Sequence, residues 1–332
     1  MIENEHTINP QKQYENEGRR RRPSAVARTR NDAAAKKSFF AVTLFPVFLI
    51  GAVTVGLLIR SWPILQSYPL QDLFFGTTWK PSNGQFGFWP FITGTLWVTA
   101  VGTLLAVPPC LLVSIYLAEY SQAITRSIAK PILDLLSAIP PVVYGVWGLL
   151  AVVPFVDTIA APLSKQYLNN IPFLAVNQPT GFGIFSAGIV LAVMIAPLVI
   201  SVIYEVIITV PNELRFASLA IGATRWETIR YVILPKVYPG IVAAIVLGAS
   251  RAVGETIAVL MVIGNVPKIP NSIFDTAYPL PALIANNYGD MMSIPLYDSA
   301  LLCAALVLLV LILVFNFIST LVLQRFLERK QI

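Results

Sequence analysis

Six long apolar stretches occur along the sequence, and they limit the possible folds more than any other feature does. About 20 apolar residues in a helix, at about 1.5 Å per residue, cross the hydrocarbon core of a bilayer. Backbone polar groups in lipid must bond within the chain, so apolar stretches of this length form helices. The sequence therefore predicts an all-α, polytopic membrane protein whose six transmembrane helices occupy 39–59, 89–117, 131–156, 182–204, 239–264 and 298–323.

Composition supports this class and argues against an enzyme or a metal-binding protein. Of the 332 residues, 56% are hydrophobic and only 12% are charged, which is too apolar for an ordinary soluble domain. Both cysteines, Cys110 and Cys303, lie in apolar stretches, and the single histidine, His6, lies in the polar N-terminal segment. We therefore expect no disulfide framework, metal site, catalytic residue or cofactor.

The positions of the basic residues predict how the chain crosses the membrane. Residues 1–38 are polar and include the run Arg19–Arg22, so we interpret them as a disordered basic tail. The tail either fixes the topology, which we favour, or binds anionic lipid or a regulator. Most of the 23 Lys and Arg residues lie in this tail, in 205–238 and near the C-terminus. The positive-inside rule then places both termini and segment 205–238 in the cytoplasm.

Segment 205–238 is expected to hold two short helices between the fourth and fifth spans. Asn212 can cap the first helix, and Glu213 suits its positive end. Gly222 follows where a left-handed residue ends that helix. Thr224 and Glu227 have the spacing of a capping box, which begins the second helix. A proline, Pro235, is expected to end it.

This segment resembles the EAA loop of ABC importer permeases. The resemblance rests on a spaced set of small, aromatic and proline residues: Ala217, Gly222, Trp226, Leu234 and Pro235. The chain departs from the usual triplet, because Phe216, Ala217 and Ser218 stand where Glu, Ala and Ala are usual. In that family the loop is a coupling helix that sits in a groove of the ATP-hydrolysing subunit. The resemblance therefore implies contact with such a subunit at Glu213, Ala217, Ser218, Gly222, Ala223, Thr224, Arg225, Trp226, Leu234 and Pro235.

Together with the six spans, these residues are similar to the PstC-type permeases of bacterial phosphate transporters. The resemblance covers roughly residues 39–324, with a permease core at 89–324. It implies a type I ABC importer permease in the bacterial inner membrane that moves phosphate by alternating access and does not itself hydrolyse ATP. The partners that it implies are a second homologous permease, a dimeric ATP-binding subunit and an extracytoplasmic phosphate-binding protein.

Two charged residues in the fifth span, Arg251 and Glu255, are the candidates for the translocation pathway. An arginine near the middle of a bilayer costs roughly 2.5 to 3.5 kcal/mol, so it needs compensation. The two residues are four apart and can pair on one helix face, either to neutralise each other or to serve transport. A guanidinium matches two oxygens of an oxyanion. In the resembled family the matching Arg and Glu are implicated in phosphate passage.

Three threonines in the second span, Thr95, Thr99 and Thr103, lie four apart and share one helix face. They are possible pathway-lining residues. Their hydroxyls can equally bond to the preceding turn in a tightly packed helix, and we favour this structural interpretation.

Three alternatives remain open from the residues. The transported oxyanion could be sulfate or molybdate, because guanidinium geometry does not choose among tetrahedral oxyanions. An ion-driven secondary transporter would lack a use for the 205–238 segment. A DNA-binding helix-turn-helix at 212–234 is opposed by its place between two spans and by having only Arg215, Arg225 and Arg230 as basic residues.

Overall fold

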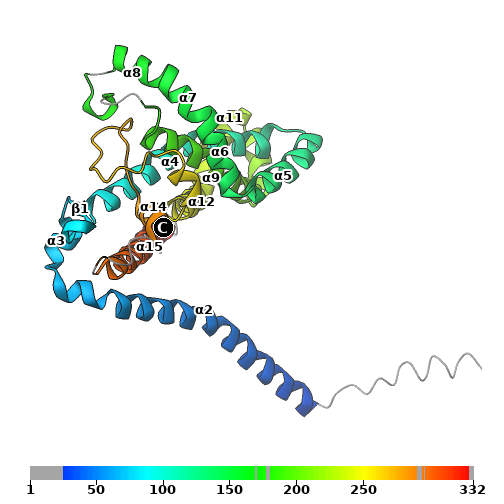
Figure 1. Cartoon of the computed structure of the whole chain (residues 1–332). Helices are drawn as coiled ribbons and strands as arrows, with labels where there is room; N and C mark the ends of the chain where they lie inside the picture. Colours follow the sequence, from blue (N-terminus) through cyan, green and yellow to red (C-terminus); the bar gives the residue numbers. More distant parts are fainter. Residues whose placement is uncertain (1–24, 169, 177–179, 290–293, 295, 329–332) are drawn as a thin grey trace, which may run out of the picture. The chain divides into compact units, whose positions relative to one another are not determined.

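The computed structural model describes residues 25–168, 170–176, 180–289, 294 and 296–328 (Figure 1). It consists of two compact units, Met1–Gly56 and Leu57–Ile332, and each is described by itself. The predictions for His6, for Arg19–Arg22 and for the rest of 1–24 lie outside the described residues.

The first unit contains most of helix α2 (Ala25–Ser67), which ends in the second unit. Residues 25–38 were expected to be disordered, and this is wrong because they are helical. They are rich in alanine and join directly to the apolar span, so each residue extends an existing helix without a new nucleus. Large apolar side chains of the span, such as Phe40, Phe45 and Phe48, are exposed, as expected of a helix surrounded by lipid.

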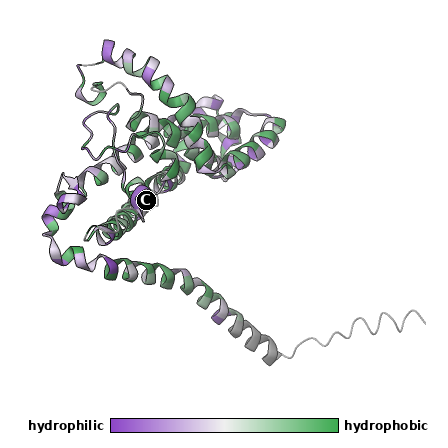
Figure 2. Cartoon of the chain, viewed as in Figure 1, coloured by the Kyte–Doolittle hydropathy of each residue, from purple (hydrophilic) through white to green (hydrophobic). Residues whose placement is uncertain are grey.

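Within the described residues, six helices are long and apolar enough to cross a membrane, which confirms the predicted all-α fold with six spans. Figure 2 shows the apolar residues concentrated on these helices. They run over Ala35–Ser67, Trp89–Tyr120, Pro141–Tyr167, Ile184–Ile208, Arg225–Val253 and Tyr297–Leu321.

The main core of the second unit forms around α9 (Ile184–Ile208), which packs along α4 (Trp89–Ile115) and against α12 (Leu234–Val253). Glycines allow the first pair to come close. A Cβ added at Gly102 would lie 2.8 Å from Leu191 Cδ2, and one at Gly188 would lie 2.7 Å from Val101 Cγ1. Small residues at such crossings let helix backbones pack tightly in a membrane.

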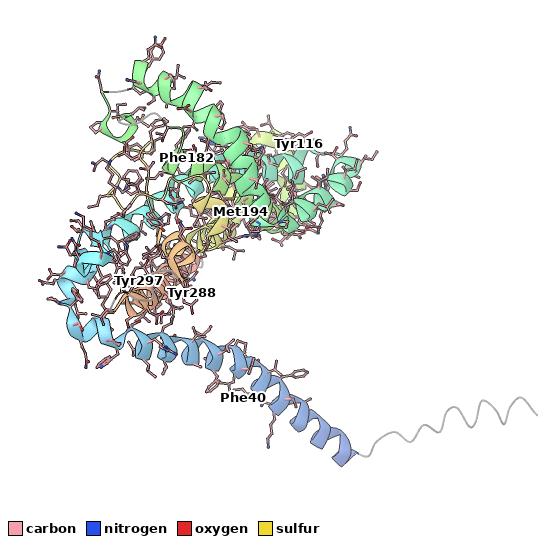
Figure 3. All side chains as sticks on the ribbon, in the orientation of Figure 1. Phe40, Tyr116, Phe182, Met194, Tyr288 and Tyr297 are labelled. Carbon is pink, nitrogen blue, oxygen red and sulfur yellow. The ribbon has the colours of Figure 1, made fainter. Side chains whose placement is uncertain are left out.

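A second core joins the ends of several elements. It lies between α3 (Leu70–Phe75), the start of α4, α14 (Leu280–Asn287) and α15 (Tyr297–Glu328). Beside it, β1 (Trp79–Lys80) and β2 (Gln85–Phe86) form an antiparallel hairpin around the turn η1 (Pro81–Asn83). The centroid of the Trp79 ring lies 5.5 Å from that of the Phe86 ring and 5.1 Å from that of the Phe91 ring. Figure 3 labels one residue of each core, Met194 on α9 and Tyr297 on α15.

The third predicted stretch, 131–156, differs from the observed helices. Its first residues belong to an amphipathic helix, α5 (Ala123–Ala138), and the apolar helix begins only at Pro141. The reason is a proline pair, because the residue before a proline avoids helical backbone. Ile139 and Pro140, each followed by a proline, have ψ values of 129° and 138°.

Past Pro141 the helix continues beyond 156, to Tyr167. It is built from short helical and π-helical segments: α6 (Pro141–Trp147), η3 (Gly148–Val152), α7 (Val153–Phe155), η4 (Val156–Ala160) and α8 (Ala161–Tyr167). A short 3₁₀ turn, η5 (Pro172–Leu174), follows.

The fifth predicted stretch, 239–264, is interrupted. Its helix, α12, ends at Val253, and the short helix α13 (Ile257–Leu260) follows after a break at Gly254–Thr256. α13 packs on α6. Glu255 lies in this break, whereas Arg251 lies in the last turn of α12, so the two residues do not share a regular helix.

Candidate functional site: the loop between α9 and α12 and the end of α12

Two short helices between α9 and α12 form the segment that the sequence singled out. They are α10 (Asn212–Ala220) and α11 (Arg225–Thr228), and Gly222 between them has φ +91°. The capping box is confirmed: Glu227 N donates to Thr224 Oγ1 at 3.2 Å, and Thr224 N donates to Glu227 Oε2 at 2.7 Å. The left-handed turn and the cap therefore fix the angle between the helices locally.

The expected cap at Asn212 is wrong. Helix α10 begins at Asn212 itself, and Pro211 occupies the N-cap position with an extended ψ of 141°. The Asn212 side chain instead accepts a hydrogen bond from Arg215 Nη1 at 3.3 Å. Because proline fixes φ and leads into the helix, the helix starts one residue earlier than expected.

The expectation that Pro235 ends the second helix is also wrong. Helix α11 continues through a π-helical turn, η6 (Ile229–Ile233), into α12, where Pro235 lies in the first turn. In an ordinary helix a proline would remove a hydrogen bond and press on the carbonyl four residues earlier. A π turn widens the backbone at that point, so the helix continues without a break.

Apolar side chains along this segment are exposed. Ile221 is 87% exposed, Phe216 67% and Trp226 50%. We call these three residues, with Leu219 and Tyr231, the exposed apolar set. The remaining predicted coupling residues differ in solvent exposure. Ser218 is buried, and Ala223 and Leu234 are half-buried. The exposed ones are Glu213, Ala217, Gly222, Thr224, Arg225 and Pro235.

Ser218 holds the two helices together. Its hydroxyl lies 2.9 Å from the hydroxyl of Thr228 on α11, and both side chains are buried. Thr228 Oγ1 also donates to the Thr224 carbonyl at 3.0 Å. A buried hydrogen bond of this kind links the two helices directly, since buried hydroxyls in proteins are usually hydrogen-bonded.

The sequence did not reveal the role of one residue in this segment, Arg215. Its guanidinium binds Glu119 in η2 (Tyr116–Tyr120), the π-helical end of α4, with Nη2 to Oε1 at 2.8 Å. It also donates to the carbonyls of Ile207 (3.1 Å), at the end of α9, and of Val210, in the loop that follows. Glu119 lies 96 positions away, so no spacing in the sequence indicates the pair.

At the other end of α12, Arg251 is half-buried in the last turn. The predicted ion pair with Glu255 is not formed, because the break at Gly254 removes the helical spacing on which it depends. Glu255 instead lies within the break, two residues before α13, where its Oε1 accepts a hydrogen bond from Ala258 N at 3.4 Å. Next to Arg251, Ser250 Oγ donates to Asn316 Oδ1 on α15 at 2.7 Å, which joins the two helices.

The three threonines of α4 that were predicted as possible pathway-lining residues have separate roles. Thr95 Oγ1 donates to the Phe91 carbonyl at 2.8 Å and accepts from Leu280 N at 2.9 Å. Thr99 Oγ1 donates to the Thr95 carbonyl at 2.8 Å. Thr103 Oγ1 is buried and has no hydrogen-bond partner among the described residues. Two of the three hydroxyls are therefore already used within the protein.

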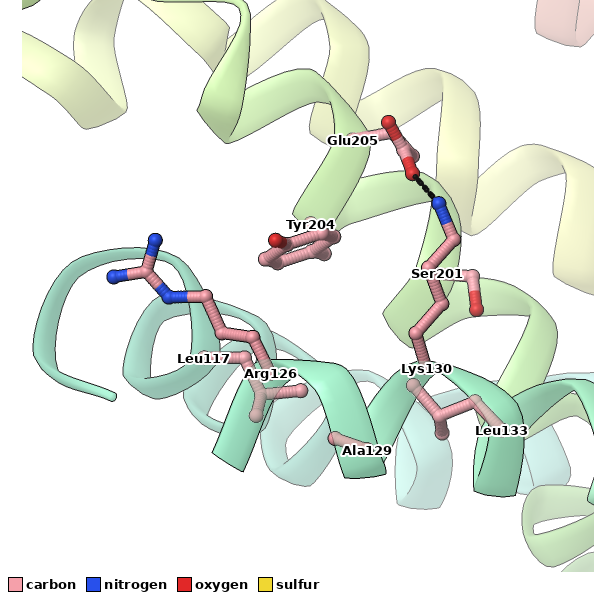
Figure 4. Close-up of a pocket in the computed structure, with 8 residues that line it drawn as sticks. All are labelled: Leu117, Arg126, Ala129, Lys130, Leu133, Ser201, Tyr204 and Glu205. Carbon is pink, nitrogen blue, oxygen red and sulfur yellow. Dashed lines mark hydrogen bonds and ion pairs between the residues drawn. The ribbon is translucent and has the colours of Figure 1, made fainter. Parts of the chain in front are cut away.

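A small pocket lies between α5, α9 and η2 (Figure 4). Arg126, Lys130 and Glu205 are among its lining residues, and Lys130 Nζ binds Glu205 Oε1 at 2.8 Å. This hydrogen bond with Glu205 raises the pKa of Lys130. The cavity measures about 20 Å³, which holds about one water and no oxyanion.

Comparison with known proteins agrees with this architecture. A family described as "Binding-protein-dependent transport system inner membrane component" matches residues 110–328, which include both α10–α11 and Arg251. The "Phosphate transport system permease protein PstC" of Mesorhizobium japonicum is 34% identical over 300 residues, 87% of this chain and 90% of that one. The protein of the same name from Haemophilus influenzae is 34% identical over 282 residues, 83% and 89% of the two chains.

A solved structure has the same fold. It belongs to a bacterial ABC transporter involved in the import of the acidic polysaccharide alginate, with a TM-score of 0.57 and 18% sequence identity. The match covers 90% of this chain and 99% of that one.

Proposed function

Since this chain belongs to the family of binding-protein-dependent transport system inner membrane components, we propose that it is the permease subunit of an ATP-driven phosphate importer. The permeases of two bacterial phosphate transport systems, each 34% identical to it over most of the chain, support the substrate. As a member of this family it is a multi-pass membrane protein that works with an ATPase and a substrate-binding protein.

The exposed apolar set carries the proposal that ATP hydrolysis in a partner drives this chain. Phe216 and Ile221 protrude from α10 and the turn after it, outside the six candidate spans, and Trp226 protrudes at the start of the span Arg225–Val253. Apolar side chains exposed to water are costly unless a partner covers them. We assign the cover to a dimeric ATP-binding subunit in the cytoplasm, on the same side as both termini.

The end of α12 supports a role in anion passage. Arg251 is half-buried, and within the described residues no carboxylate forms an ion pair with it. A permanent charge without a protein counter-ion is suited to an oxyanion, because the guanidinium fork matches two of its oxygens. Glu255, across the break, is the proposed counter-charge after the anion leaves. Of the three threonines, only Thr103 keeps a hydroxyl free for the pathway.

The remaining partners are a second homologous permease and an extracytoplasmic phosphate-binding protein. With them the spans expose the Arg251 region alternately to each side of the membrane.

The permease with its proposed partners is reconstituted in liposomes, and uptake of labelled phosphate is measured with and without ATP. We expect ATP-dependent uptake that unlabelled phosphate competes away and that equal sulfate or molybdate does not. Uptake without ATP, or stronger competition by sulfate or molybdate, would contradict the proposal.

A further inference from the structure

We propose that Arg215 is a positioning residue that transmits movement of α10 to α4 and α9 through its bonds to Glu119, Ile207 and Val210. The inference rests on the proposed function, because it concerns how work done on α10 reaches the spans. It adds a residue that the predicted coupling set did not contain.

The contacts of Arg215 join three elements. Nη2 and Nε donate to Glu119 Oε1 at 2.8 and 3.2 Å, on the end of α4. Nη2 also reaches the Ile207 carbonyl at the end of α9, and Nη1 reaches the Val210 carbonyl in the short loop that follows it. Bonds between a guanidinium and a carboxylate are shorter and stronger than neutral ones, and the planar fork fixes their direction.

The burial of this pair separates it from an ordinary surface ion pair. The side chains of Arg215 and Glu119 are 16% and 12% exposed. The pair Lys130–Glu205 has the same N to O distance, 2.8 Å, but its side chains are 63% and 51% exposed. Solvent and salt weaken an exposed pair, whereas a partly buried pair holds its geometry.

The other main contacts of α10 are with elements that continue into α12. Helix α10 packs mainly on α11 and η6, which continue into α12. A displacement of α10 therefore reaches α12 through packed backbone, and it reaches the end of α4 through the bonds of Arg215 to Glu119, beside the packing of Leu214 on the main core. Glu119 lies in a π-helical turn, and such turns often occur at functional positions in helices.

The experiment uses the whole complex in liposomes and measures phosphate uptake, ATP hydrolysis and subunit assembly in the same preparations. In Arg215→Gln we expect assembly and ATP hydrolysis near those of the native complex, and phosphate moved per ATP reduced about tenfold, a typical size for coupling between sites. Arg215→Lys should retain part of the ratio, because a lysine reaches the carboxylate but not both carbonyls as well. Lys130→Gln, which breaks the exposed pair, is the matched control and should leave the ratio unchanged.

A second variant, at the other partner of the ion pair, tests the inference if the Arg215→Gln complex fails to assemble. Glu119→Gln keeps the shape of the side chain and leaves Arg215 bonded to the two carbonyls, and we expect it to lower the same ratio. The double variant Glu119→Gln/Arg215→Gln should match Arg215→Gln alone, since both changes break one connection. An unchanged ratio, or uptake and ATP hydrolysis falling by equal factors, would overturn the inference. Lack of ATP-driven phosphate uptake by the native complex would instead overturn the proposed function.

Discussion

The hydroxyl of Thr95 accepts a hydrogen bond of 2.9 Å from the backbone N–H of Leu280, a residue 185 positions later in the chain. The same hydroxyl donates to the Phe91 carbonyl at 2.8 Å. Thr95 is 2% exposed and Leu280 is fully buried. The Thr95 side chain of α4 therefore accepts the hydrogen bond of the first backbone N–H of α14, a helix whose N-cap residue makes no side-chain hydrogen bond.

Thr95→Val should destabilise the protein by about 1 to 3 kcal/mol, because the buried N–H of Leu280 would lose its partner. The free energy of unfolding in mixed detergent micelles, followed by denaturing detergent, measures this effect. Thr99→Val is the matched control: Thr99 donates only to the carbonyl of the preceding turn, so its loss should stay below about 1 kcal/mol. Thr103→Val removes a buried hydroxyl without a partner and should be neutral or stabilising. Equal losses in all three variants would contradict the proposed role of Thr95.

Gly222→Val should reduce both ATP-driven uptake and the stimulation of ATP hydrolysis by the permease. Gly222 has φ +91°, a conformation that costs a β-branched residue about 1 to 3 kcal/mol. No atom lies within 4 Å of an added Cβ, so the effect comes from the backbone alone. Gly222→Asn separates strain from size, because asparagine tolerates left-handed backbone. We expect near-native activity for Asn, and equal defects in the two variants would show that strain is not the cause.

Ile221→Asp should weaken assembly with the ATP-binding subunit without changing the stability of the permease. Ile221 is 87% exposed, so a charge there costs the isolated permease little. In a desolvated interface the same change costs about 2 kcal/mol or more, a thirtyfold loss of affinity. Binding of the purified ATP-binding subunit to the permease in nanodiscs measures it. Ile221→Leu keeps the apolar contact and should bind normally; unaltered binding by the Asp variant would place the partner elsewhere.

Arg251→Ala should lower phosphate uptake at least about a hundredfold, since two charge-assisted hydrogen bonds are worth about 3 kcal/mol or more. Arg251→Lys should recover only part of the uptake, because the ammonium lacks the planar fork. Uptake and assembly are measured together, so that a failure to assemble is seen. Lys165→Ala, at an exposed basic residue on α8, is the control for a general loss of charge. Full uptake by the Arg251→Ala complex would remove Arg251 from the pathway.

The spans could be predicted from sequence because hydrophobic length alone determines them. The start of α4 at Trp89 agrees with the predicted stretch 89–117. Hydropathy failed where the chain stays apolar through a break, as at Gly254, since apolar residues continue on both sides. It also missed α5, because Arg126 and Lys130 give the first half of this helix the composition of a loop, whereas the second half was assigned to the span 131–156.

Local signals in the candidate site were predicted better than distant contacts. The left-handed Gly222 and the capping box of Thr224 and Glu227 depend on neighbours in sequence, and both are confirmed. The bond between Arg215 and Glu119 depends on two helices meeting in space, and a single sequence does not contain that information. The effect of Pro235 was misjudged because a π turn upstream accommodates it.

The helix runs without interruption from α11 through η6 to α12, so a small rotation at one end displaces the other end. Arg225 and Arg251 lie near its two ends, about 39 Å apart along the axis at about 1.5 Å per residue. Over that length, a rotation of about 5° about one end shifts the other by about 3 Å. A slight tilt imposed near Arg225 thus becomes a displacement comparable to the width of an oxygen atom near Arg251.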